Sequence, residues 1–214
     1  FELNTNLTMK KLFLCSYFAE VGELFRDFVD GSLYGKSVTF IPTASFYEDY
    51  RAYVDEGKMV LEKMGLEIEN LELSQSAADE IKKTIERNDY IYLSGGNTFF
   101  LLSELKRSGA DKIIKQQVAN GKIYIGESAG AAVASETVEY MRGMDDVIKP
   151  NPQPPDFMGL GLVDCCIVPH YKSYPFEKKC EKILSQYSDL KLIPITNKQA
   201  VKIFGKRMEI RTRD

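Results

Sequence analysis

The chain has 214 residues, of which 44% are hydrophobic and 28% are charged, and its formal net charge is -3. This length and composition are typical of one globular domain with a sizeable core. The small negative charge gives no electrostatic reason to expect binding to nucleic acid or to an anionic membrane, and no apolar stretch approaches the length of a membrane span.

The first residues and the cysteines carry the expectations about domains and location. Residues 1–8 lack the basic and apolar regions of a secretion signal, so we expect a tail or added residues ahead of a single α/β domain over 9–214. The four cysteines include no Cys-x-x-Cys pair, and with one histidine in the chain a structural zinc site is not expected. Buried thiols in a reducing compartment are expected instead, which predicts a cytoplasmic location.

Apolar runs of strand length alternate with longer amphipathic stretches as far as residue 135. Strands are predicted over residues 12–17, 37–41, 66–73, 90–93 and 123–125, and helices over 19–30, 47–64, 77–87, 99–106, 111–119 and 131–135. Helices of this length between strands imply right-handed crossovers, so the order predicts an α/β fold with a mostly parallel sheet flanked by helices. Functional atoms are then expected at the carboxyl ends of the strands.

The pattern changes after residue 140. The stretch over 141–156 is rich in Pro, Asp, Gly and Asn and predicts an irregular excursion. A strand over 165–168 is expected to rejoin the sheet, followed by a helix over 176–187. Closing strands, partly antiparallel, are predicted over 192–195, 200–204 and 208–210.

The strongest motif is Gly-x-Ser-x-Gly around Ser128, placed between a predicted strand and a helix of small residues. A nucleophile elbow needs this order, because the serine hydroxyl is held out at a sharp turn where neighbouring side chains would clash. The other interpretation is a glycine-rich turn whose serine only caps a helix. The placement between strand and helix favours a catalytic serine.

His170 is the only histidine of the chain and directly follows a predicted buried strand. A serine needs a base to act as a nucleophile near neutral pH, and imidazole is the usual base. A third group has to orient this imidazole. We favour Asp146 in the irregular stretch, with Asp145 beside it and Asn197 at the end of another predicted strand as alternatives.

A second glycine-rich turn follows the strand over 90–93. Free N–H groups at the helix start after this turn point towards developing negative charge, so Gly96 and Ala129, the residue after the serine, are predicted to form an oxyanion hole. The other interpretation is a plain turn with a capping asparagine. Further candidates to line the cleft or contact a substrate are residues 42–45 and Asn97, Glu127, Tyr171 and Lys172.

Three segments, Ser94–Thr98, Gly126–Ala131 and Pro169–Tyr171, occur in the order found in the peptidase E (aspartyl dipeptidase) family of serine peptidases, which the chain resembles from Met9 onward. The resemblance implies the three-layer, flavodoxin-like fold of class I glutamine amidotransferases, in which a cysteine replaces this serine. It also implies Ser128 as nucleophile, His170 as base, Gly96 and Ala129 as oxyanion donors, and Asp146 as the match to the family's loop aspartate.

These residues predict a serine peptidase that hydrolyses short peptides through an acyl-enzyme, without a metal or organic cofactor. Residues 172–179 contain no arginine, which recognition of a substrate aspartate would be expected to use, so cleavage of Asp-Xaa dipeptides stays open. Assembly into a homo-oligomer also stays open. Two alternatives remain. One is a small esterase of the Gly-x-Ser-x-Gly type, and the other is a non-catalytic module that holds a carboxylate or phosphate in its glycine-rich turns.

Overall fold

The computed structural model describes residues 9–146 and 156–214, so the expectation for residues 1–8 and most of that for 141–156 lie outside it. Within these ranges no helix is long and apolar enough to cross a membrane. All four cysteines are buried and carry free thiols.

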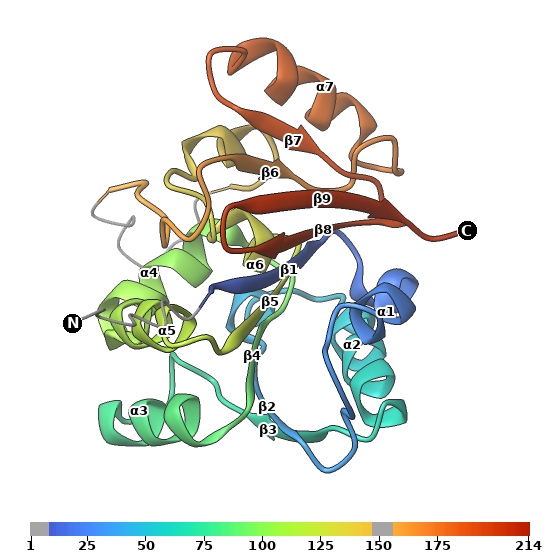
Figure 1. Cartoon of the computed structure of the whole chain (residues 1–214). Coiled ribbons are helices and arrows are strands. Elements are labelled where there is room, and N and C mark those ends of the chain that lie inside the picture. The colour runs from blue at the N-terminus through green and yellow to red at the C-terminus, as the bar shows by residue number, and fades with distance from the viewer. Residues whose placement is uncertain (1–8, 147–155) are drawn as a thin grey trace, which may run out of the picture.

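A seven-stranded sheet with the order β3-β2-β4-β5-β1-β8-β9 forms the centre of the molecule (Figure 1). Its parallel part consists of β1 (Lys11–Cys15), β2 (Ser37–Ile41), β3 (Glu67–Asn70), β4 (Tyr90–Leu93) and β5 (Ile123–Glu127). Two antiparallel strands, β8 (Gln199–Phe204) and β9 (Arg207–Thr212), extend it beyond β1. The predicted mostly parallel sheet is confirmed.

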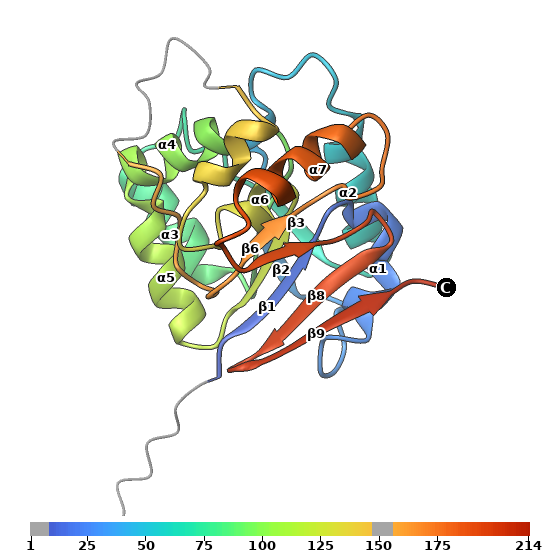
Figure 2. The ribbon, with the colours of Figure 1, turned by 90° about the horizontal axis from the view of Figure 1, so that it is seen from above.

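Helices cover both faces of this sheet, which gives three layers (Figures 1 and 2). One face is covered by α1 (Phe18–Arg26) and α2 (Ala52–Lys63), and the other by α3 (Ala78–Arg87), α4 (Thr98–Ser108), α5 (Ala110–Ala119) and α6 (Ala129–Ala132). Each face has its own apolar core. On one face Phe13 of β1 packs against Phe18 and Phe25 of α1 in an aromatic cluster, and aliphatic side chains predominate on the other face. Burial of both cores is what holds the three layers together.

One predicted strand lies elsewhere than expected. The apolar run around β6 (Cys166–Val168) is predicted to rejoin the main sheet, but β6 pairs with β7 (Leu192–Pro194) in a separate two-stranded parallel sheet. The reason is that β8 already occupies the edge of β1, with Leu14 opposite Val201. The small sheet and α7 (Glu177–Gln186) lie beside the β8 end of the main sheet (Figure 1).

The predicted helix over 47–64 is shorter than expected, because α2 begins at Ala52. Before it, a short 3-10 helix η1 (Thr43–Ser45) is followed by Phe46 and Tyr47, whose rings pack against Phe100 of α4. This packing ties the segment to α4 and leaves residues 48–51 as an exposed turn. A second short 3-10 helix, η2 (Glu139–Gly143), overlaps the start of the stretch predicted to be irregular.

Candidate active site

The chain turns sharply at Ser128, between β5 and α6. Ser128 has φ 50° and ψ −106°, a conformation that L-residues rarely adopt, and its N–H donates to the carbonyl of Cys15 at 2.9 Å. A Cβ at Gly126 would lie 2.5 Å from the carbonyl oxygen of Gly130, and a Cβ at Gly130 would lie 2.1 Å from that of Leu93. Both flanking glycines are therefore required by close backbone approach.

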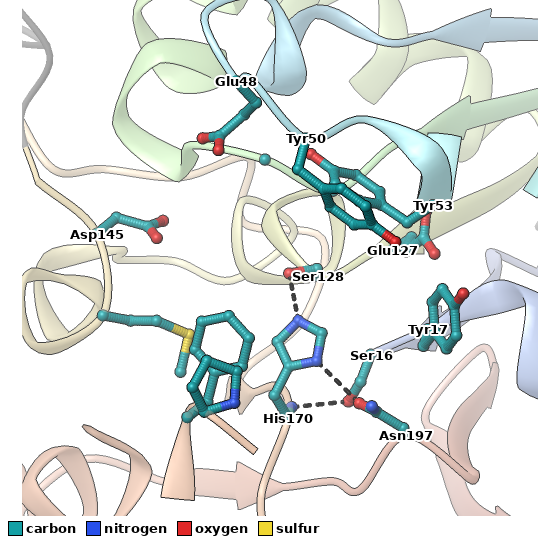
Figure 3. Close-up of a pocket in the computed structure, with 15 residues that line it drawn as sticks. Ser16, Tyr17, Glu48, Tyr50, Tyr53, Glu127, Ser128, Asp145, His170 and Asn197 are labelled. Carbon is teal, nitrogen blue, oxygen red and sulfur yellow. Dashed lines mark hydrogen bonds between the residues drawn. The ribbon is translucent and has the colours of Figure 1, made fainter. Parts of the chain in front are cut away.

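Ser128 Oγ lies 2.9 Å from Nε2 of His170 (Figure 3). His170 follows β6 and has φ 63°, and its N–H donates to Ser16 Oγ at 3.0 Å. The ring stacks on Phe176, with 4.7 Å between the ring centroids. Although β6 belongs to a different sheet, its carboxyl end faces the same pocket as that of β5. Ser128 and His170 therefore meet, as predicted.

The group that contacts the other ring nitrogen is Asn197, whose Oδ1 lies 2.8 Å from Nδ1 of His170. Our preference for Asp146 at this position was wrong, because Asp146 is exposed and its backbone carbonyl accepts a hydrogen bond from Nδ2 of Asn97. Asp145 does not contact this nitrogen either, and its carboxylate accepts the N–H of Thr98 at 2.9 Å. Asn197 precedes β8, which pairs with β1 and so carries this residue to the imidazole.

Gly96 and Ala129 are both beside the serine. Gly96 has φ +132°, and a Cβ there would lie 2.3 Å from the carbonyl carbon and oxygen of Ala44, so only glycine fits. Ala129 follows Ser128 at the start of α6. Within residues 9–146 and 156–214, neither N–H has an intramolecular acceptor. Both amides therefore have a donor left for a ligand.

Burial shifts the pKa values of several groups that line the pocket. Burial lowers the pKa of His170 below its ordinary 6.5, and the hydrogen bond to Asn197 partly opposes this. Burial also raises the pKa of Glu127 to about 7 and that of Asp145 to about 6, in each case against hydrogen bonds that favour the charged form. A neutral imidazole at neutral pH is the form that a general base requires.

Two of the other predicted contact residues have structural roles. Asn97 caps α4, with its Oδ1 accepting the N–H groups of Phe99 and Phe100. Glu127 is buried under the pocket, where its carboxylate accepts the N–H of Phe18 and the hydroxyl of Tyr92.

The remaining candidates lie outside the pocket lining. Tyr171 is half-buried, and Lys172 is exposed with its ammonium 5.3 Å from the centroid of the Tyr171 ring. Residues 42–45 do not line the pocket either. They support the second glycine turn from behind, since the carbonyl of Ala44 accepts the N–H of Asn97.

The pocket around Ser128 and His170 has a volume of about 470 Å³. Sequence reasoning missed several of its lining residues: Ser16, Tyr17, Glu48, Tyr50, Tyr53, Met144, Pro175 and Phe176. For Ser16 and Tyr17 a signal was present, because they directly follow β1, the parallel neighbour of β5. Glu48 and Tyr50 had no such signal, because they were placed inside a predicted helix.

A serine hydroxyl paired with an imidazole at the strand ends of a three-layer α/β sandwich defines the class of protein as serine-type hydrolases. Comparison with known proteins then gives the family. The model of peptidase family S51 matches residues 12–211, and the chain therefore belongs to this family of serine-type peptidases.

Individual relatives agree with this assignment. The chain is 48% identical over 194 residues to an uncharacterized peptidase of Listeria innocua, covering 90% of this chain and 92% of the relative. It is 32% identical over 170 residues to peptidase E of a Nostoc species, covering 76% of this chain and 66% of the relative. A crystal structure of a candidate peptidase E protein from Listeria monocytogenes EGD-e matches with a TM-score of 0.90 at 43% identity, over 96% of this chain and all of the other.

Proposed function

We propose that the chain is a dipeptidase-like serine peptidase that hydrolyses short peptides, with Ser128 as nucleophile, His170 as general base and Asn197 as the residue that orients His170. The observation that carries this proposal is the continuous chain of contacts Ser128–His170–Asn197. The volume of the pocket suits a substrate of a few residues, and curated relatives carry the name peptidase E.

The contacts of His170 assign a direction to proton transfer. Oδ1 of Asn197 can only accept, so Nδ1 of the imidazole carries the proton and Nε2 presents its lone pair to the hydroxyl of Ser128. Ser128 Oγ attacks the peptide carbonyl carbon while its proton passes to Nε2. The negative charge that develops on the carbonyl oxygen is stabilised by the N–H groups of Gly96 and Ala129.

Collapse of the tetrahedral intermediate breaks the C–N bond. His170 gives its proton to the leaving amine, which departs and leaves Ser128 acylated. Water then loses a proton to Nε2 as it attacks the ester, and the acid product leaves as that proton returns to Ser128 Oγ. Two contacts keep the imidazole in place through both halves of the reaction. The backbone N–H of His170 donates to the hydroxyl of Ser16, and the imidazole ring stacks on the ring of Phe176.

Labelling with a fluorophosphonate tests the proposal, because only an activated serine reacts readily. We expect the wild type to be labelled at Ser128, and Ser128→Ala and His170→Ala to lose both labelling and dipeptide hydrolysis, with kcat lower by about a thousandfold or more. An unlabelled wild type would exclude the mechanism. Rates on p-nitrophenyl acetate and on dipeptides separate an esterase from a peptidase, and we expect the dipeptides to be preferred.

The four buried, free thiols also support a cytoplasmic location, which we include in the proposal. A fluorescent fusion that localises outside the cytoplasm would contradict it.

A further inference from the structure

Three acidic side chains line the pocket around Ser128. Glu48, Glu127 and Asp145 contribute to its wall, and none of the described residues that line it is a lysine or an arginine. Tyrosine and phenylalanine rings make up much of the rest of the wall. A substrate entering this pocket therefore meets negative charge beside the nucleophile.

The three carboxylates are not equivalent. Figure 3 shows Glu48 and Asp145 on one side of Ser128 and Glu127 on the other, beside Tyr53. Glu127 is fixed by the N–H of Phe18 and the hydroxyl of Tyr92. In the described part of the chain, Glu48 and Asp145 form no salt bridge.

Electrostatic coupling also indicates that these carboxylates share one space. The charge of Glu48 contributes to the raised pKa of Asp145, after burial as the largest cause. Burial, followed by the charges of Glu48 and Glu127, raises the pKa of Tyr53. Two basic residues act on this region from outside the lining. Arg51 and Lys179 are both exposed, and the ammonium of Lys179 is bound to the carbonyl of Met144 at 2.9 Å.

A dipeptide substrate brings one α-ammonium group, which can neutralise only one of the carboxylates. Resting on the proposed function, we infer that the substrate residue whose carbonyl meets Ser128 also carries a positively charged side chain, as lysine, ornithine or arginine do, and that Glu48 and Asp145 are the residues that select it. An aspartate at this position would meet like charges on the same side of the pocket. The like-charge contact disfavours acidic substrates.

The direct test compares substrates that differ only in charge. Lys-Ala and norleucine-Ala have the same side-chain carbon skeleton, but only lysine ends in an ammonium group. We expect kcat/KM for Lys-Ala to exceed that for norleucine-Ala by about tenfold, as a partly screened ion pair predicts, and Asp-Ala to be the slowest of the three. Equal rates for lysine and norleucine, or faster cleavage of Asp-Ala, would overturn the inference.

Substitutions assign the preference to named residues. Glu48→Gln and Asp145→Asn are each expected to reduce the ratio of kcat/KM for Lys-Ala to that for norleucine-Ala severalfold. Glu48→Gln is the safer variant for folding, because Asp145 also accepts the N–H of Thr98. Asp49→Asn is the matched control, since Asp49 is exposed in the same turn but does not line the pocket. An equal loss of selectivity in Asp49→Asn would contradict recognition inside the pocket.

Binding to Ser128→Ala keeps this test independent of catalysis. Calorimetry with this variant should show tighter binding of Lys-Ala than of norleucine-Ala, with the difference shrinking at high salt. If fluorophosphonate fails to label the wild type but Lys-Ala binds selectively, the proposed chemistry fails and the inferred selectivity stands. If labelling succeeds and the two dipeptides bind equally, only the selectivity is wrong.

Discussion

Asn197 contacts Nδ1 of His170 through a neutral amide oxygen, at 2.8 Å, where a charged carboxylate would be the more familiar partner. A neutral partner fixes the orientation and tautomer of the ring without adding charge to the site. It therefore leaves the pKa of His170 governed mainly by burial, which lowers it.

The first prediction concerns the charge of this partner. Asn197→Asp places a carboxylate beside Nδ1, which favours the imidazolium and raises the pKa of His170. Because the neutral imidazole is the base, kcat/KM falls on the acid side as His170 becomes protonated. We expect the acid limb of the wild-type profile to lie below pH 6.5, and that of Asn197→Asp to lie about one pH unit higher. Asn197→Ala, which only removes the partner, should lower kcat/KM by about a hundredfold. An unshifted acid limb in Asn197→Asp would contradict this role.

The second prediction concerns Ser16, which accepts the N–H of His170 and donates to the carbonyl of Ile195. Removing this hydroxyl in Ser16→Ala leaves the N–H of His170 without its acceptor, whereas the carbonyl of Ile195 keeps the N–H of Tyr171. We therefore expect a loss of about 1–2 kcal/mol in the free energy of unfolding, measured by denaturant titration. The misplaced imidazole should also lower kcat more than it changes KM. Ser173→Ala, in the loop after His170, is the control and should leave kcat unchanged.

The third prediction separates stability from activity at the second glycine turn. Gly96→Ala puts a methyl group 2.3 Å from the carbonyl of Ala44 at φ +132°, so it should destabilise the fold by about 3 kcal/mol or more. Gly95→Ala puts a methyl group 3.2 Å from Cβ of Ser128 and 3.3 Å from the ring of Tyr53. We expect thermal unfolding of this variant close to that of the wild type, and a lower rate of dipeptide hydrolysis. A normal rate in Gly95→Ala would show that the space above Ser128 is not used.

The fourth prediction concerns the pH dependence of stability. Burial raises the pKa of Glu127 from an ordinary 4.5 to about 7, so between these pH values the folded chain binds more protons than the unfolded chain. The contribution of Glu127 to stability is therefore full below pH 4.5 and decreases as the pH rises to about 7, by roughly 3 kcal/mol. In Glu127→Gln, the free energy of unfolding measured by denaturation at several pH values should lack this decrease. The exposed Glu62→Gln should retain the slope of the wild type.

The sequence allowed much of the fold to be predicted because strand and helix periodicities alternate clearly through β5, and each glycine-rich turn directly follows a buried strand. Ser128 and His170 could be paired for the same reason, since both follow apolar runs. Periodicity does not say which sheet a three-residue strand joins, and so β6 was misplaced.

The orienting residue and the acidic wall of the pocket could not be assigned in this way. Choosing Asn197 over Asp146 depends on how far β8 extends along β1, which is a tertiary pairing. Glu48 enters the pocket because Phe46 and Tyr47 pack against Phe100, a contact between segments more than fifty residues apart. Local sequence patterns carry no information about either contact.

The late position of Asn197 in the chain has a consequence for biosynthesis. Ser128 and His170 leave the ribosome well before β8 and β9, which cover the edge of β1 and bring the amide to the imidazole. A nascent chain that stops short of these strands has its nucleophile but no oriented base. The proposed hydrolytic centre is therefore complete only after these strands are made, and a chain that loses them to proteolysis from its C-terminal side loses the contact that orients its base.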